Sequence, residues 1–78
     1  MTQLSKKTLS NSIRTLRFMA GEMTQQQLAD RVGVTRQTIV AIEQNKYAPS
    51  LEVAFRIADV FSKGLEDVFQ YPRDNPIK

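Results

Sequence analysis

The sequence contains no cysteine and no histidine. Without cysteine the chain can form no disulfide and none of the thiolate metal sites that stabilise many small proteins. Without histidine it lacks the commonest general base and a common metal ligand. These absences point away from a disulfide-stapled, metal-binding or catalytic protein, so we expect no metal, no cofactor and no enzymatic activity.

Long apolar runs are also missing. No stretch approaches the roughly 20 apolar residues that a membrane-spanning helix needs, and the N-terminal sequence MTQLSKKTLS lacks the apolar core of a signal peptide. We therefore expect a soluble, cytoplasmic protein. Its net charge of +3 is mildly basic, which suits a nucleic-acid partner but does not establish one.

The 78 residues suffice for one small domain, and helical periodicity dominates it. Ser10 is placed to cap a first helix over residues 11–20. Thr24 and Gln27 have the spacing of a capping box, so a second helix should begin at Gln25. Gly33 can take the left-handed conformation that ends it.

Three further helices follow the same logic. Thr35 can cap a helix over residues 36–44, Ser50 can cap one over residues 51–62, and Gly64 opens a short one over residues 65–69. The residues expected to face inward on the second, third and fourth helices are Leu28, Ala29, Val32, Ile39, Ile42, Leu51, Ala54, Ile57, Ala58 and Phe61.

The outer face of the third helix has an unusual composition. With Ile39 and Ile42 turned inward, that face carries Gln37, Val40, Ala41 and Gln44, flanked by Arg36 and Thr38. A face that only meets solvent usually carries lysine and glutamate, whereas the side chains of this face are mostly uncharged and include the small residues Val40 and Ala41. It suits the major groove of DNA, which is wide enough for one helix. From periodicity alone, an ordinary helical hairpin with a polar exterior remains an equal alternative.

The stretch TQQQLADRVGVTRQTIVAIEQNKYAPSL, followed by AFRIADVF, resembles the helix-turn-helix of phage repressor and Cro-like (cI-like) regulators, the xenobiotic-response-element or XRE family. The resemblance covers most of the chain and includes small stand-alone members. It implies an all-α, compact five-helix lambda-repressor-like domain over residues 11–71, with an N-terminal segment over 1–10 and a C-terminal tail over 72–78. A short extended tail is expected to pair with the N-terminal segment or with a partner chain.

The resemblance also implies roles for individual residues. The residues expected to contact base edges are Arg36, Gln37, Thr38, Val40 and Ala41. The residues expected to contact phosphates are Thr24, Gln25, Thr35, Gln44, Asn45, Lys46 and Tyr47. For Gln25, orientation of Gln37 is a second possible role. The alternative for Asn45 and Lys46 is that they only cap the third helix, and the alternative for Tyr47 is that it covers the edge of the core.

A first-helix arginine usually pairs with the third-helix glutamate in this family. Here the turn LRFMAGEM is one residue longer than is common, so either Arg14 or Arg17 can pair with Glu43.

The implied function is that of a DNA-binding transcriptional regulator, a repressor, acting as a homodimer on palindromic double-stranded operator DNA. The expected dimer interface contains Leu65, Val68, Phe69 and Tyr71, although the first three also suit the monomer core. Since the chain has no room for a sensor domain, a regulatory protein partner is another expectation. The alternative function is an antitoxin or a protein-interaction module with the same fold.

Overall fold

A computed structural model describes residues 9–71, which form five helices and a two-stranded ribbon. The helices are α1 (Ile13–Met19), α2 (Gln25–Val32), α3 (Arg36–Glu43), α4 (Leu51–Val60) and α5 (Leu65–Val68). The strands β1 (Ser10–Asn11) and β2 (Phe69–Gln70) pair antiparallel, with Ser10 opposite Gln70 and Asn11 opposite Phe69. The predicted five-helix fold with a short extended tail is confirmed. The remaining parts of the predicted end segments, residues 1–8 and 72–78, lie outside the described residues.

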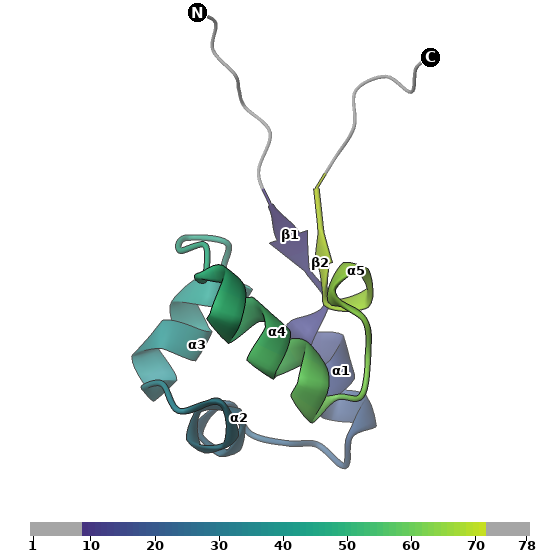
Figure 1. Cartoon of the computed structure of the whole chain (residues 1–78). Coiled ribbons are helices and arrows are strands. Elements are labelled where there is room, and N and C mark those ends of the chain that lie inside the picture. The colour runs from purple at the N-terminus through teal and green to yellow at the C-terminus, as the bar shows by residue number, and fades with distance from the viewer. Residues whose placement is uncertain (1–8, 72–78) are drawn as a thin grey trace, which may run out of the picture.

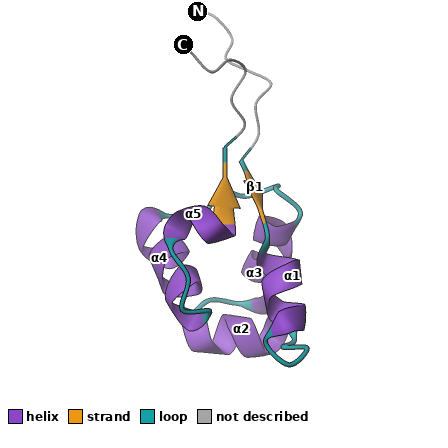
Figure 2. Cartoon of the chain, turned by 90° about the vertical axis from the view of Figure 1, so that its right-hand side faces the viewer, coloured by secondary structure: helices purple, strands orange, loops and turns teal. Residues whose placement is uncertain are grey.

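The ribbon and α2 lie at opposite ends of the domain, as both whole-chain views show (Figures 1 and 2). Helix α3 lies on the side away from α5, and α4 runs between them (Figure 1). This arrangement leaves the outer side of α3 uncovered by any other described helix.

The core draws on every helix and on β2. Within residues 9–71 it contains no buried polar or charged residue. Its members are Ile13, Met23, Leu28, Ala29, Val32, Ile39, Ile42, Ala54, Ile57, Ala58, Val68 and Phe69. The predicted inward residues of α2 and α3 are all in this set, so the orientation of α3 predicted from its periodicity is confirmed.

Local capping explains where α2, α3 and α4 begin. The Thr24 hydroxyl accepts from the Gln27 amide N–H at 3.0 Å, and the Gln27 side-chain carbonyl accepts from the Thr24 N–H at 2.9 Å. The Thr35 hydroxyl accepts from the Thr38 N–H at 3.2 Å, and the Ser50 hydroxyl accepts from the Val53 N–H at 3.2 Å. Each cap satisfies a backbone donor that the helix itself leaves unpaired.

Gly33 makes the turn between α2 and α3. Its φ of 90° is left-handed, a conformation in which a Cβ would meet the following carbonyl. Its N–H donates to the Ala29 carbonyl at 2.8 Å, and the Arg56 guanidinium of α4 donates to the Val32 carbonyl at 3.1 Å. The turn is therefore held both by its own backbone and by α4.

Helix α1 starts later than predicted. Ser10 does not cap it, because Ser10 and Asn11 are extended and pair with β2. The N-cap position is Ser12, while the Asn11 side-chain carbonyl accepts from the Ile13 N–H at 3.1 Å. Residues that favour a helix start were thus drawn into a strand by a partner far along the chain.

Three predictions about the later helices also differ from the structure. Leu51 does not face inward but is 66% exposed, and α4 ends at Val60, with Ser62 in a left-handed conformation. Helix α5 ends at Val68 because Phe69 is already extended and belongs to β2. Phe61, predicted to be inward, is half-buried against the core.

Candidate functional site

The outer side of α3 carries the residues that were predicted to read bases. Arg36 and Gln37 are exposed, while Thr38, Val40 and Ala41 are half-buried. The Thr35 and Thr38 hydroxyls lie 3.0 Å apart, which leaves Thr38 engaged at the start of the helix. The five predicted base-reading residues thus all belong to α3, whose outer side no other described helix covers. Their predicted role in base reading remains a prediction.

The first turns of α2 and α3 carry no acidic residue, whereas α4 begins with Glu52 and α5 with Glu66 and Asp67. An acid in the first turn offsets the positive end of the helix dipole and occupies free N–H groups. In α2 and α3 these groups are satisfied only in part by the threonine caps. The two helix starts are therefore suited to an external anion.

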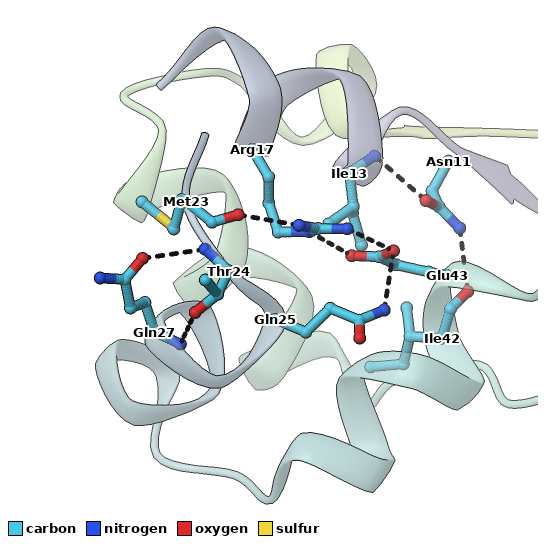
Figure 3. Close-up of polar contacts among 9 residues, drawn as sticks. All are labelled: Asn11, Ile13, Arg17, Met23, Thr24, Gln25, Gln27, Ile42 and Glu43. Carbon is cyan, nitrogen blue, oxygen red and sulfur yellow. Dashed lines mark hydrogen bonds and ion pairs between the residues drawn. The ribbon is translucent and has the colours of Figure 1, made fainter. Parts of the chain in front are cut away.

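Glu43 joins three elements near the start of α2 (Figure 3). Its carboxylate accepts from Arg17 Nε at 2.6 Å and from Arg17 Nη2 at 3.0 Å, and Gln25 Nε2 donates to it at 3.3 Å. Arg17 Nη1 also donates to the Met23 carbonyl at 2.8 Å. The structure thus selects Arg17 over Arg14 as the partner of Glu43. It also commits the Gln25 amide nitrogen to Glu43 rather than to Gln37.

The ion pair is well shielded from solvent. Only 15% of the Arg17 side chain and 8% of the Glu43 side chain are exposed. Two parallel N–H to carboxylate bonds fix the orientation of both groups. The pair therefore holds α1 and the end of α3 together and fixes the position of Gln25.

The loop after α3 is built by its backbone. Asn45 is left-handed, with a φ of 61°. The N–H groups of Asn45 and Lys46 donate to the carbonyls of Ile42 and Ala41, each at 2.9 Å. Asn45 and Lys46 thus cap α3 through their main chain, which leaves the exposed Lys46 side chain to act elsewhere.

Asn11 ties this loop to the ribbon. Its side-chain nitrogen donates to the Ile42 carbonyl at 2.9 Å and to Asn45 Oδ1 at 3.0 Å (Figure 3 shows the first bond). The four predicted phosphate-contacting residues Gln44 to Tyr47 are all exposed. Asn11 was not singled out from the sequence, since nothing local indicates that a residue of β1 would reach the end of α3.

The residues expected at a dimer interface divide into two groups. Val68 is fully buried within the monomer, Phe69 is 8% exposed, and Leu65 is half-buried against the core. Tyr71 is 59% exposed. Phe55, which the sequence did not indicate as an interface residue, is 53% exposed and lies one turn from Leu51 on α4. The sequence signal that could have indicated Phe55 is its place next to Ala54, at the edge of the buried face of α4.

Two kinds of site have no candidate in the part of the chain that the structure describes. No group of three or more potential metal-ligating side chains gathers there. Nor does any helix within residues 9–71 have the length and apolar character to cross a membrane.

The sequence matches known proteins over most of its length. A family model described as helix-turn-helix matches residues 13–68. An uncharacterized HTH-type transcriptional regulator of Methanocaldococcus jannaschii is 54% identical over 52 residues, covering 67% of this chain and 79% of that protein. A second one, YgzD of Bacillus subtilis, is 43% identical over 67 residues, covering 86% of this chain and all of that protein. An uncharacterized HTH-type transcriptional regulator of Archaeoglobus fulgidus is 52% identical over 52 residues, which cover 67% of this chain and 73% of that protein.

Proposed function

We propose that this chain, which belongs to the XRE-type helix-turn-helix family, is a sequence-specific DNA-binding transcriptional regulator that acts as a repressor. The observation that carries the proposal is the outer side of α3. No other described helix covers it, its side chains are mostly uncharged, and the nearby starts of α2 and α3 carry no acidic residue. Such a surface allows a polyanion to approach closely, which a surface that only meets solvent does not need.

Base reading is proposed for α3 in the major groove, which is about 12 Å wide and admits one helix. Gln37 suits bidentate pairing with adenine, and Arg36 suits guanine. Val40 and Ala41 are small enough to let the helix approach and can meet thymine methyl groups. The polar Thr38 completes this set at the first turn of the helix.

Phosphate contacts are proposed at both ends of α3. Thr24, Gln25 and Thr35 lie at helix starts, where N–H groups and the helix dipole favour an anion. Gln44, Asn45, Lys46 and Tyr47 form the exposed loop that follows α3, and the start of α2 lies beside this same end, where Gln25 donates to Glu43. Contacts of this kind position the protein on the duplex, while α3 supplies the sequence preference.

A homodimer on a palindromic operator follows from the small size of the reading surface. One α3 reaches only a few base pairs, too few for selection among genomic sites. Two copies related by a two-fold axis would place their α3 helices about 34–36 Å apart, one turn of DNA. We place the interface on α4, α5 and Tyr71, where Leu51 and Phe55 add exposed apolar area. Glu52 and Arg56, which pair on the same helix at 2.8 Å, give this face charges of both signs that a second copy can match.

The proposal includes no enzymatic activity and no cofactor. Repression requires only that the bound dimer cover promoter DNA. Regulation is proposed to act through a protein partner, the concentration of the repressor or the dimer equilibrium. We expect it to act in the cytoplasm, where it meets the chromosome.

A titration of the full chain against DNA tests the proposal. The probes are a duplex from immediately upstream of its own gene and a shuffled duplex of equal length, at several salt concentrations. We expect specific binding to exceed binding to the shuffled duplex by at least about 10³-fold. Equal and weak binding to both duplexes would favour the alternative function, an antitoxin or protein-interaction module.

A further inference from the structure

An open cavity of about 540 Å³ lies beside α1, at the edge of the proposed DNA-binding surface. Its lining joins three elements that are separated in the sequence. The lining residues are Arg14, Arg17, Thr24, Gln25, Glu43 and Gln44. Three of them, Thr24, Gln25 and Gln44, are already among the proposed phosphate contacts, whereas Arg14 comes from outside the helix-turn-helix.

The two arginines of this cavity differ in their surroundings. All three guanidinium nitrogens of Arg17 donate within the protein, to Glu43 and to the Met23 carbonyl (Figure 3). Glu43 is the only acid of the lining, and it is occupied by Arg17. Arg14 is exposed and takes part in no hydrogen bond or ion pair between residues 9–71. Among residues 9–71, Arg14 is therefore the charged side chain of this cavity that has no ion-pair partner.

The placement of Arg14 follows from helical spacing. Arg14 and Arg17 are three residues apart on α1, so they share a face of that helix. Arg17 is drawn inward by Glu43, which leaves Arg14 one turn further along the same face. Its planar guanidinium has the geometry to bind two oxygens of one phosphate.

We propose that Arg14 is a phosphate-contacting residue and that this cavity receives a backbone phosphate of the bound DNA. The inference rests on the proposed function and extends its DNA contacts to α1. Glu43 acts in it as a positioning residue: by neutralising Arg17 and holding Gln25, it shapes a cavity in which Arg14 provides the charge. The contact carries no sequence information, because a phosphate is common to every base pair.

The test compares the salt dependence of DNA affinity for the full chain, Arg14→Gln, Arg14→Lys and Arg31→Gln. Arg31 is the matched control, since it is an exposed arginine near the end of α2 and lines none of this cavity. We expect Arg14→Gln to weaken binding to the upstream and shuffled duplexes alike. It should reduce the slope of log affinity against log salt by about 0.9, the value for one phosphate contact. Arg14→Lys should keep most of the slope, because it keeps the charge.

Each result supports or removes the inference. A slope for Arg14→Gln equal to that of Arg31→Gln overturns it, while leaving the proposed function intact if the full chain still prefers the upstream duplex. If the full chain binds neither duplex, the inference falls together with the proposed function. Unchanged circular dichroism of the variants shows that the comparison concerns binding, since an exposed Arg14 makes no described contact that folding needs.

Discussion

Gln37 and Lys46 lie on the same proposed surface but should act on different parts of the duplex. Gln37 is exposed on α3 and suits a base edge, whereas Lys46 lies in the loop beyond it and suits a phosphate. We expect Gln37→Ala to weaken binding to the operator by about 1–3 kcal/mol and to relax the choice at one base pair. Lys46→Ala should weaken binding to all sequences alike and lower the salt slope by roughly 1.

Fluorescence anisotropy with operator duplexes changed at one position each measures both effects. The shuffled duplex serves as the control for binding that does not depend on sequence. If Gln37→Ala and Lys46→Ala lose affinity for operator and shuffled DNA in equal proportion, Gln37 does not read bases.

Ala29 tests the packing of α2 rather than its surface. It is fully buried on α2, the helix that packs against both α3 and α4. Ala29→Leu adds volume that the site cannot absorb, and we expect it to cost about 1–3 kcal/mol of the free energy of unfolding. Urea denaturation gives that value. Ala20→Leu, at an exposed alanine after α1, should change it far less, and similar midpoints for the two variants would contradict the assigned packing.

At the scale of elements, two ion pairs in the same chain allow a direct comparison. Arg17–Glu43 joins α1 to α3 and is largely shielded, whereas Glu52–Arg56 lies along α4 with side chains 73% and 52% exposed. Removing one partner of a shielded pair leaves a charge without its counterion, which costs about 3–5 kcal/mol. An exposed pair contributes about 0–1 kcal/mol.

We therefore expect Glu43→Gln to destabilise the domain by about 3 kcal/mol and Glu52→Gln by less than about 1 kcal/mol. Both substitutions keep the shape of the side chain and remove one negative charge, so they form a matched pair. Denaturation midpoints at low and high salt separate the two, because only the exposed pair should be screened. Equal losses would mean that Arg17–Glu43 is no more than a surface contact.

The elements that could be predicted from the sequence are those whose signals are local. Thr24, Thr35 and Ser50 each bond an N–H three residues on, so the starts of α2, α3 and α4 follow from short stretches. The start of α1 depends on Asn11 pairing with Phe69 at the other end of the chain, which no local pattern reveals. The choice of Arg17 over Arg14 is of the same kind, since the two share a helical face and only the packing of α3 distinguishes them.

Some features of the candidate site also follow from local sequence, whereas others depend on tertiary packing. The composition of the outer side of α3 follows from its 3.6-residue period once Ile39 and Ile42 are known to point inward. The cavity beside α1 does not follow, because its walls come from three helices. Phe55 was missed for a related reason: a side chain at the flank of a helix is buried or exposed according to the neighbour it meets.

For the molecule as a whole, the decisive property is its oligomeric state. Val68 and Phe69 are part of the monomer core. A truncation that removes them would therefore unfold the domain rather than isolate a monomer. A surface substitution is the better probe. Phe55 on α4 and Phe18 on α1 are both exposed phenylalanines, at 53% and 67%, but only Phe55 lies on the proposed interface.

We expect the full chain to sediment as a dimer at micromolar concentration and Phe55→Glu to sediment as a monomer, because a second copy would bury the new charge without a partner. Phe18→Glu should remain dimeric.

On DNA, Phe55→Glu should lose the preference for a palindrome over a single half-site, while the full chain and Phe18→Glu keep it, since two linked α3 helices bind adjacent half-sites together. A full-length chain that is monomeric at micromolar concentration, and that binds one half-site as tightly as the palindrome, would remove the dimer from the proposal. A loss of dimers in both variants would place the interface elsewhere than on α4.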